Sequence, residues 1–233
     1  VARVSGSYTS ITGTGALDAG SITSGFGNID NGSSTITTTG LGTFGTLAVN
    51  GATTITTADN TAQLTLISTD ADGDKGPVFQ LKRDSSSPAD NDVLGRVLFQ
   101  FDDDGGNETT AVQIEASATD VSDGAEDASL NIVTMVNGNT RGRLKFNATE
   151  AVFNDDSQDL DFRVEGDGNT HALFVQGGTD KVAIGNSNPN DFGSTASDLV
   201  IGTTSGEHGL TIASGTGNGG RIQFADNTSS PFR

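Results

Sequence analysis

The chain has 233 residues, of which 33% are hydrophobic and 32 are glycine, and its formal net charge is −18. Each ordered residue costs about 1–2 kcal/mol of conformational entropy, and glycine costs the most, so this supply of apolar side chains is thin for a compact monomer. The negative charge argues against binding to nucleic acid or to anionic membranes, both of which require patches of Lys and Arg. Without cysteine, the chain has no disulfide, thiolate zinc site or cysteine nucleophile.

The first predicted region, residues 1–57, is a Gly/Thr-rich β shaft or stalk. It contains 14 Thr and 11 Gly. Single apolar residues recur in it at short intervals without a helical period: Ile11, Leu17, Ile22, Phe26, Ile29, Ile36, Leu41, Phe44 and Leu47. This spacing favours an intertwined shaft with one inward residue per short strand. A flexible linker rich in Gly, Ser and Thr is the alternative.

Residues 58–150 form the second predicted region, a module of β-strands and hairpins. Apolar and polar residues alternate in six segments: 64–68, 77–84, 96–102, 112–116, 130–136 and 143–147. Such alternation predicts strands with one buried and one wet face. Asn137-Gly138 lies between two of these strands and predicts a hairpin turn, because Asn and Gly readily adopt positive φ. No segment has the apolar stripe of a helix, and residues 120–130 are predicted to be a loop.

The third predicted region, residues 151–233, is a repeat-like shaft segment of short β rungs that leads toward a missing C-terminal region. Its inward apolar residues are predicted to be Leu160, Phe162, Val164, Leu173, Val175, Val182 and Ile184. Residues 165–169 and 177–180 are predicted turns between these rungs. Together with Phe99, Phe101 and Phe146, Phe162 is expected to be largely buried.

An acidic segment, residues 68–76, places Asp70, Asp72 and Asp74 at alternate positions. Lys75 stands where an EF-hand calcium loop requires Gly, and no helix is predicted on either side, which argues against an EF-hand. A looser Ca²⁺ or Mg²⁺ site on Asp70, Asp72 and Asp74 is one interpretation. The acidic residues of 101–108 have the same interpretation. A solvated acidic turn is the favoured alternative.

Signatures of catalysis are missing from the sequence. His171 and His208 are the only histidines, and neither an HExxH motif nor a GxSxG motif occurs. We therefore predict that the protein is not an enzyme. A pair of carboxylates that cleaves glycans would leave no mark in the sequence, so this alternative stays open.

Three segments resemble tail-fibre and related receptor-binding structural proteins of tailed bacteriophages, especially marine ones: residues 11–40, 162–185 and 217–230. The most specific of them is FRVEGDGNTHALFVQGGTDKVAIG (162–185). The resemblance implies an elongated homotrimer of β structure, often completed by a C-terminal chaperone that removes itself. No such chaperone is recognised here. We expect the chain, which begins at Val1, to be a segment of a longer or processed polypeptide.

Together these observations predict an all-β fold, organised as an elongated fibrous homotrimer with an intertwined β shaft and short-strand modules. The expected function is a structural and adhesive segment of a viral tail fibre or spike that positions host-receptor binding. Its expected partners are two further copies of the chain, other tail proteins of the virion and a host surface glycan or protein. Its expected location is the extracellular virion tail. A glycan-degrading tailspike enzyme and a bacterial surface adhesin or filament subunit are the alternatives.

Overall fold

The computed structural model describes residues 32, 33, 35–193 and 198–222. The chain divides into two compact units, residues 1–66 and 67–233. In the first unit, the described residues form turns and irregular chain without a strand. Most of the shaft predicted for residues 1–57 lies outside the described residues.

The predicted strands at 64–68 and 77–84 are wrong for the single chain, where both segments are irregular. Neither segment has a neighbouring strand to receive its backbone hydrogen bonds, and an isolated strand is not stable in water. Part of the second segment is nevertheless held in place. Arg83 pairs with Asp92 at 2.9 Å and donates a hydrogen bond to the carbonyl of Val93, while Leu81 lies over Gly95.

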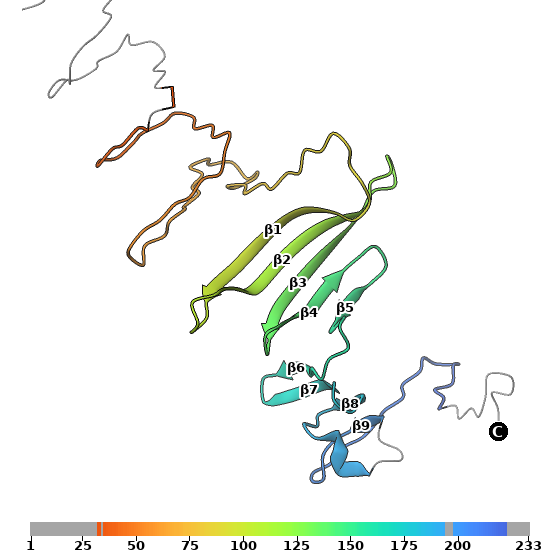
Figure 1. The fold of residues 1–233 in the computed structure, drawn as a ribbon. Coiled ribbons are helices and arrows are strands. Elements are labelled where there is room, and N and C mark those ends of the chain that lie inside the picture. Colours follow the sequence, from red (N-terminus) through yellow and green to blue (C-terminus); the bar gives the residue numbers. More distant parts are fainter. Residues whose placement is uncertain (1–31, 34, 194–197, 223–233) are drawn as a thin grey trace, which may run out of the picture. The chain divides into compact units, whose positions relative to one another are not determined.

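Five strands form an antiparallel meander in which sequence neighbours are also neighbours in the sheet (Figure 1). They are β1 (Asp92–Asp102), β2 (Glu108–Asp120), β3 (Asp127–Val136), β4 (Asn139–Phe146) and β5 (Ala151–Phe153). Each of the four predicted strands between residues 96 and 147 coincides with one of β1 to β4. The predicted loop at 120–130 is confirmed over its central residues, since β2 ends at Asp120 and β3 begins at Asp127.

Polar turns connect these strands. Asn137 and Gly138 have φ values of 49° and 75°, which confirms the predicted two-residue hairpin between β3 and β4. Between β1 and β2, the Asp103 carboxylate accepts hydrogen bonds from the amides of Gly105 and Asn107. Asn147 closes the β4–β5 turn in the same manner. Short polar side chains that bond nearby amides explain why these connections are rich in Asp and Asn.

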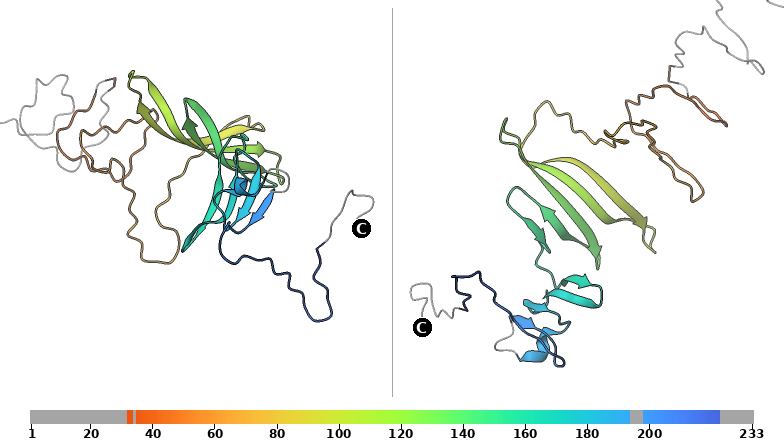
Figure 2. Two further views of the ribbon diagram at one scale, coloured as in Figure 1. Left: turned by 90° about the horizontal axis from the view of Figure 1, so that it is seen from below. Right: turned by 180° about the vertical axis from the view of Figure 1, so that it is seen from behind.

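A smaller sheet follows, drawn in cyan and blue in Figure 2. Its strand order is β6-β7-β8-β9, and Figure 1 labels these strands. Its strands are β6 (Phe162–Gly166), β7 (Asn169–Gln176), β8 (Lys181–Ile184) and β9 (Leu199–Ile201). The first three are antiparallel, whereas β8 and β9 are parallel and are connected through the 3₁₀ helix η1 (Pro189–Phe192). The strands predicted between residues 162 and 184, and the turns between them, are confirmed. The organisation of this region as rungs of a shaft stays a prediction.

The buried core lies in this smaller sheet. Phe174, Ala183 and Val200 occupy neighbouring positions on β7, β8 and β9, and are the buried hydrophobic residues of its described part. Pro189 of η1 is also buried. A core of this size is small for a chain of this length.

The fold of the described residues is all-β, as predicted, and the only helix among them is η1. Within the same residues, no helix has the length and apolarity that crossing a bilayer requires.

Candidate functional site

One side of the five-stranded sheet is apolar across its whole width. In the register of the sheet, Val97, Ile114, Ile132, Leu144 and Phe153 stand side by side on five successive strands. Residues two positions away continue the same side, in which Thr134 and Arg141 are the polar register neighbours of Val112. We call the following residues the apolar face: Val97, Phe99, Phe101, Val112, Ile114, Leu130, Ile132, Leu144, Phe146 and Phe153.

Much of the apolar face is open to solvent in the single chain. Phe99 and Phe153 are each 54% exposed, and Phe101 and Phe146 are 50% and 43% exposed. The expected burial of Phe99, Phe101 and Phe146 is therefore not reached within one chain. Rings and aliphatic side chains at these exposures leave on the order of 500 Å² of apolar surface open, which is a large patch for a soluble monomer.

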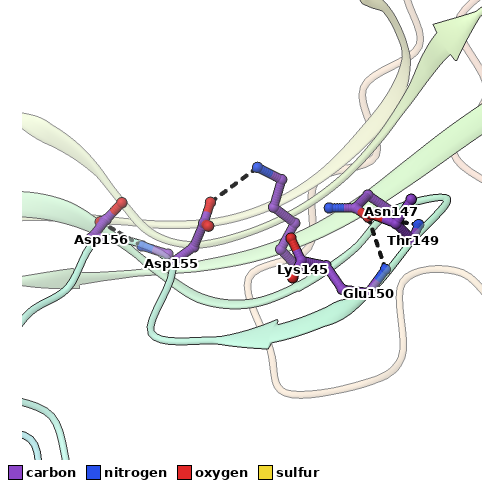
Figure 3. A network of polar contacts seen from close by, with 7 residues as sticks. Lys145, Asn147, Thr149, Glu150, Asp155 and Asp156 are labelled. Carbon is purple, nitrogen blue, oxygen red and sulfur yellow. Dashed lines mark hydrogen bonds and ion pairs between the residues drawn. The ribbon is translucent and has the colours of Figure 1, made fainter. Parts of the chain in front are cut away.

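The opposite side of the sheet is mainly polar, although Leu98 and Val133 lie there as register neighbours of Gln113. Arg96, Glu115, Asn131 and Lys145 occupy one cross-strand row, and Arg96 forms an ion pair with Glu115. Lys145 pairs with Asp155 at 3.0 Å, as Figure 3 shows. Opposite charges on neighbouring strands stabilise strand pairing and stay hydrated, so this row of residues is stable in contact with solvent. The sheet is therefore amphipathic, and its apolar face exposes more large apolar side chains than its polar side does.

The smaller sheet has a second apolar side, opposite its buried core. Phe162, Val175, Val182 and Leu199 are register neighbours there. Ile184 is 44% exposed, and Val164, Leu173 and Leu199 are exposed as well. The predicted inward residues of β6 to β8 do share this side, but the buried ring is Phe174, which points the other way. Sequence reasoning missed it because both sides of β7 are apolar, so alternation alone does not say which is covered.

A pocket of about 390 Å³ lies beside the loop that follows β5. We call it the loop pocket. It is lined by Arg143, Phe153, Asn154, Ser157, Gln158, Leu160, Asp161, Phe162, Val175, Gln176, Gly177 and Asp180. The rings of Phe153 and Phe162 contact each other with centroids 4.9 Å apart, which joins the apolar residues of the two sheets at this point.

The loop beside the pocket is firmly built. Asn154 and Gln158 exchange two hydrogen bonds, of 2.7 and 3.0 Å. The Asp156 carboxylate accepts a hydrogen bond from the Gly142 amide, at the bulge where β4 shifts its register against β3. With the Lys145–Asp155 pair, these contacts fasten the loop to β4 (Figure 3).

Backbone strain also collects at the loop pocket. Asn154, Ser157 and Asp180 have φ values of 65°, 51° and 56°. Residues other than glycine adopt this conformation at a cost, and such residues gather at binding sites. The sequence carried no signal for this pocket, because its residues come together only through the packing of separate elements.

The structure does not assemble the predicted metal site. The Asp70 and Asp72 carboxylates accept hydrogen bonds from the amides of Asp72 and Asp74, at 3.3 and 3.0 Å, which is the geometry of consecutive polar turns. In the described part of the chain, no group of three or more His, Cys, Asp or Glu side chains is placed to hold a metal ion. The calcium or magnesium site at Asp70, Asp72 and Asp74 stays a prediction.

Three aspartates have an altered acidity. The backbone amide of Asn107 and then its side chain lower the pKa of Asp103, and hydrogen bonds from Thr61 and Ser122 lower the pKa of Asp59 and Asp120. All three carboxylates close turns. Their acidity therefore reflects turn geometry and gives no indication of catalysis.

The histidines also serve local structure. His171 packs edge-on against the Phe174 ring, with centroids 4.9 Å apart. His208 lies against the backbone of Gly202, where φ is 92° and any side chain would collide with the imidazole.

The chain was compared with protein families and with curated proteins. No family model matches it, and no curated protein shows significant similarity.

Proposed function

We propose that the chain is a structural and adhesive segment of a viral tail fibre or spike, assembled as a homotrimer in the extracellular virion tail. The observation that supports the proposal best is the uncovered apolar face of the five-stranded sheet. A single amphipathic layer becomes stable only when its apolar side packs against another layer. Further copies of the same chain supply that layer without any other component.

Three features of the chain agree with this reading. The core of Phe174, Ala183 and Val200 is too small to stabilise the whole chain alone. Both sheets carry an exposed apolar side, as interchain packing requires. Polar turns such as those at Asp103 and Asn147 keep the connections solvated.

The assembly would act mechanically. Three copies on one shaft present three identical contacts to a host surface, and multivalency multiplies weak affinities. The partners in this proposal are other tail proteins of the virion and a host glycan or protein, with no role for nucleic acid or for insertion into a membrane. The resemblance of residues 162–185 to tail-fibre proteins points in the same direction.

Sedimentation at several concentrations in the low micromolar range tests the assembly. We expect a trimer, and we expect the melting temperature to rise with concentration because folding and association are coupled. A compact monomer whose cooperative melt is independent of concentration would contradict the proposal. Immunogold labelling of virions and of host cells distinguishes a tail protein from a bacterial surface adhesin.

A glycan-degrading tailspike is the competing function. Asp161 and Asp180 both line the loop pocket, and glycosidases use two carboxylates. Release of new reducing ends from host polysaccharide would favour the enzyme, whereas binding without turnover would favour the adhesive fibre.

A further inference from the structure

The loop pocket differs from the apolar face, to which Phe153 belongs, because seven of its twelve lining residues are polar or charged, although apolar atoms make up more of its exposed surface. Its volume of about 390 Å³ falls in the range of about 300–1,000 Å³ that is typical of small-molecule sites. Two carboxylates, Asp161 and Asp180, lie in its wall. A dry interface between protein copies would bury these charges, which is costly unless the second copy supplies opposite charges. The lining therefore fits a polar ligand better than a dry protein contact.

Several polar atoms of the lining are open to a ligand. Gly177 donates a hydrogen bond to one oxygen of Asp161, and the other oxygen is left over. Gln176 accepts hydrogen bonds from Thr179 and Asn190 through its carbonyl oxygen, which leaves its amide N–H groups available. No described residue donates a hydrogen bond to the Asp180 carboxylate or forms an ion pair with it.

The lining offers both donors and acceptors. Arg143 uses only its Nε, which donates to Thr134 at 2.6 Å, so its two terminal nitrogens are further donors. The carbonyl oxygen of the Gln158 side chain is a further acceptor, because that side chain donates through its nitrogen. A hydroxyl group both donates and accepts, so a ligand with many hydroxyls satisfies such a lining.

The apolar part of the lining completes the description of the ligand. The paired rings of Phe153 and Phe162, with Leu160 and Val175, offer an apolar wall beside the polar one. The aliphatic C–H face of a sugar ring stacks on such a wall while its hydroxyls reach the polar groups. The two carboxylates, together with a net charge of −18, repel anionic ligands.

We propose that the loop pocket binds one or two units of a neutral, hydroxyl-rich glycan. Asp180, Asp161 and Gln158 would accept hydrogen bonds from its hydroxyls, Gln176 and Arg143 would donate, and the Phe153–Phe162 pair would carry the ring. This inference deepens the adhesive role proposed above by naming a receptor class and a site, and it rests on that role only for its biological meaning.

Titration by saturation-transfer NMR tests the site. The probes are maltotriose, mannotriose and a galactose trisaccharide as neutral sugars, and an alginate trisaccharide as the anionic one. Each is added up to about 10 mM, which fills nine-tenths of a site with a Kd of about 1 mM. We expect at least one neutral sugar to bind and the alginate trisaccharide to bind at least tenfold more weakly.

Two variants connect the signal to the pocket. Asp180→Asn removes the charge but tolerates the positive φ of this position, and we expect about tenfold weaker binding because a hydrogen bond to a charged group is replaced by a neutral one. Phe153→Leu removes one ring of the pair and should weaken binding to a similar extent. The matched control is Asp167→Asn, in the β6–β7 turn outside the pocket, which should bind as the unmodified chain does.

Three results would overturn the proposal: binding of none of the three neutral sugars, equal binding by the Asp180→Asn and control variants, or equal or tighter binding of the alginate trisaccharide. If another copy of the chain fills the pocket in the assembled protein, none of the neutral sugars will bind. Sedimentation of the same samples reports the oligomeric state separately. A result that contradicts glycan binding by the pocket is therefore distinguishable from one that contradicts the proposed trimer.

Discussion

Asp103 shows how single aspartates shape this chain. Its carboxylate accepts hydrogen bonds from the backbone amides of Gly105 and Asn107 and from the Asn107 side chain, at 2.9 to 3.2 Å. It thereby closes the turn between the two longest strands of the sheet. The abundance of aspartate in this sequence is explained largely by such turns, in which a short carboxylate replaces a missing backbone acceptor.

Replacement of Asp103 by alanine should lower the melting temperature near neutral pH. Because the hydrogen bonds from Asn107 hold the pKa of Asp103 below its ordinary value of 3.8, the folded state binds its proton less readily than the unfolded state does. The stabilising contribution is therefore present above pH 3.8 and is lost as the pH falls through the lower pKa of the folded state. Thermal melts of both proteins across this range should converge at the acid end.

Asp104→Ala is the control, since no described residue forms a hydrogen bond or ion pair with the Asp104 side chain. It should melt close to the unmodified chain. An Asp103→Ala difference that stays constant down to the lowest pH would show that the carboxylate acts through something other than its charge.

At the scale of the element, neighbouring residues of one strand have opposite roles. Ile114 lies on the apolar face, and Gln113 lies on the polar side, where it donates a hydrogen bond to Glu115. In the single chain Ile114 is 36% exposed. If copies of the chain cover the apolar face, a charge at Ile114 would be buried in the assembly, whereas a charge at Gln113 would stay in solvent.

Ile114→Asp should therefore dissociate the assembly, because an unpaired buried charge costs several kcal/mol. Gln113→Asp, one position away, is the matched control and should leave the oligomer intact. Sedimentation equilibrium measures both. An Ile114→Asp chain that assembles with unchanged affinity would mean that the apolar face is not the interface.

The strands of the large sheet were predictable because alternation has the period of a strand and polar turns mark its ends. Two other predicted strands, at 64–68 and 77–84, have the same alternation and fail in the single chain. The alternation of apolar and polar residues shows that a segment is able to form a strand. The strand forms only when a neighbouring strand is present to pair with it. The apolar side chains that alternate in these segments, such as Leu64, Leu66 and Phe79, stay exposed.

The candidate site lay beyond the reach of the sequence for a related reason. Arg143 comes from a bulge in β4, Asn154 from a loop and Asp180 from a turn of the smaller sheet, and no spacing in the chain connects them. The acidic triplet at Asp70, Asp72 and Asp74 has a conspicuous spacing, but one oxygen each of Asp70 and Asp72 accepts a hydrogen bond from a neighbouring amide, and the three carboxylates do not converge. A regular spacing of charged residues in the sequence does not by itself bring their side chains together in space.

At the scale of the whole molecule, charge opposes assembly. Each chain carries −18, so a trimer carries −54. Self-repulsion of this size disfavours a compact assembly, and salt relieves it because the screening length falls from about 30 Å at 0.01 M to about 3 Å at 1 M. We expect the melting temperature and the fraction of trimer to rise across this range of NaCl.

Calcium gives this prediction a sharper form. If Asp70, Asp72 and Asp74 bind Ca²⁺, as their spacing suggests, CaCl₂ should stabilise the protein more than NaCl does at the same ionic strength. Asp72→Asn should abolish the excess, since an amide oxygen can still accept the hydrogen bond from Asp74 while the charge is lost. Asp104→Asn, in a different acidic turn, removes one charge as well and should keep the excess. Thermal melts of the three proteins in both salts decide the matter: equal effects of the two salts on the unmodified chain would leave screening as the whole explanation.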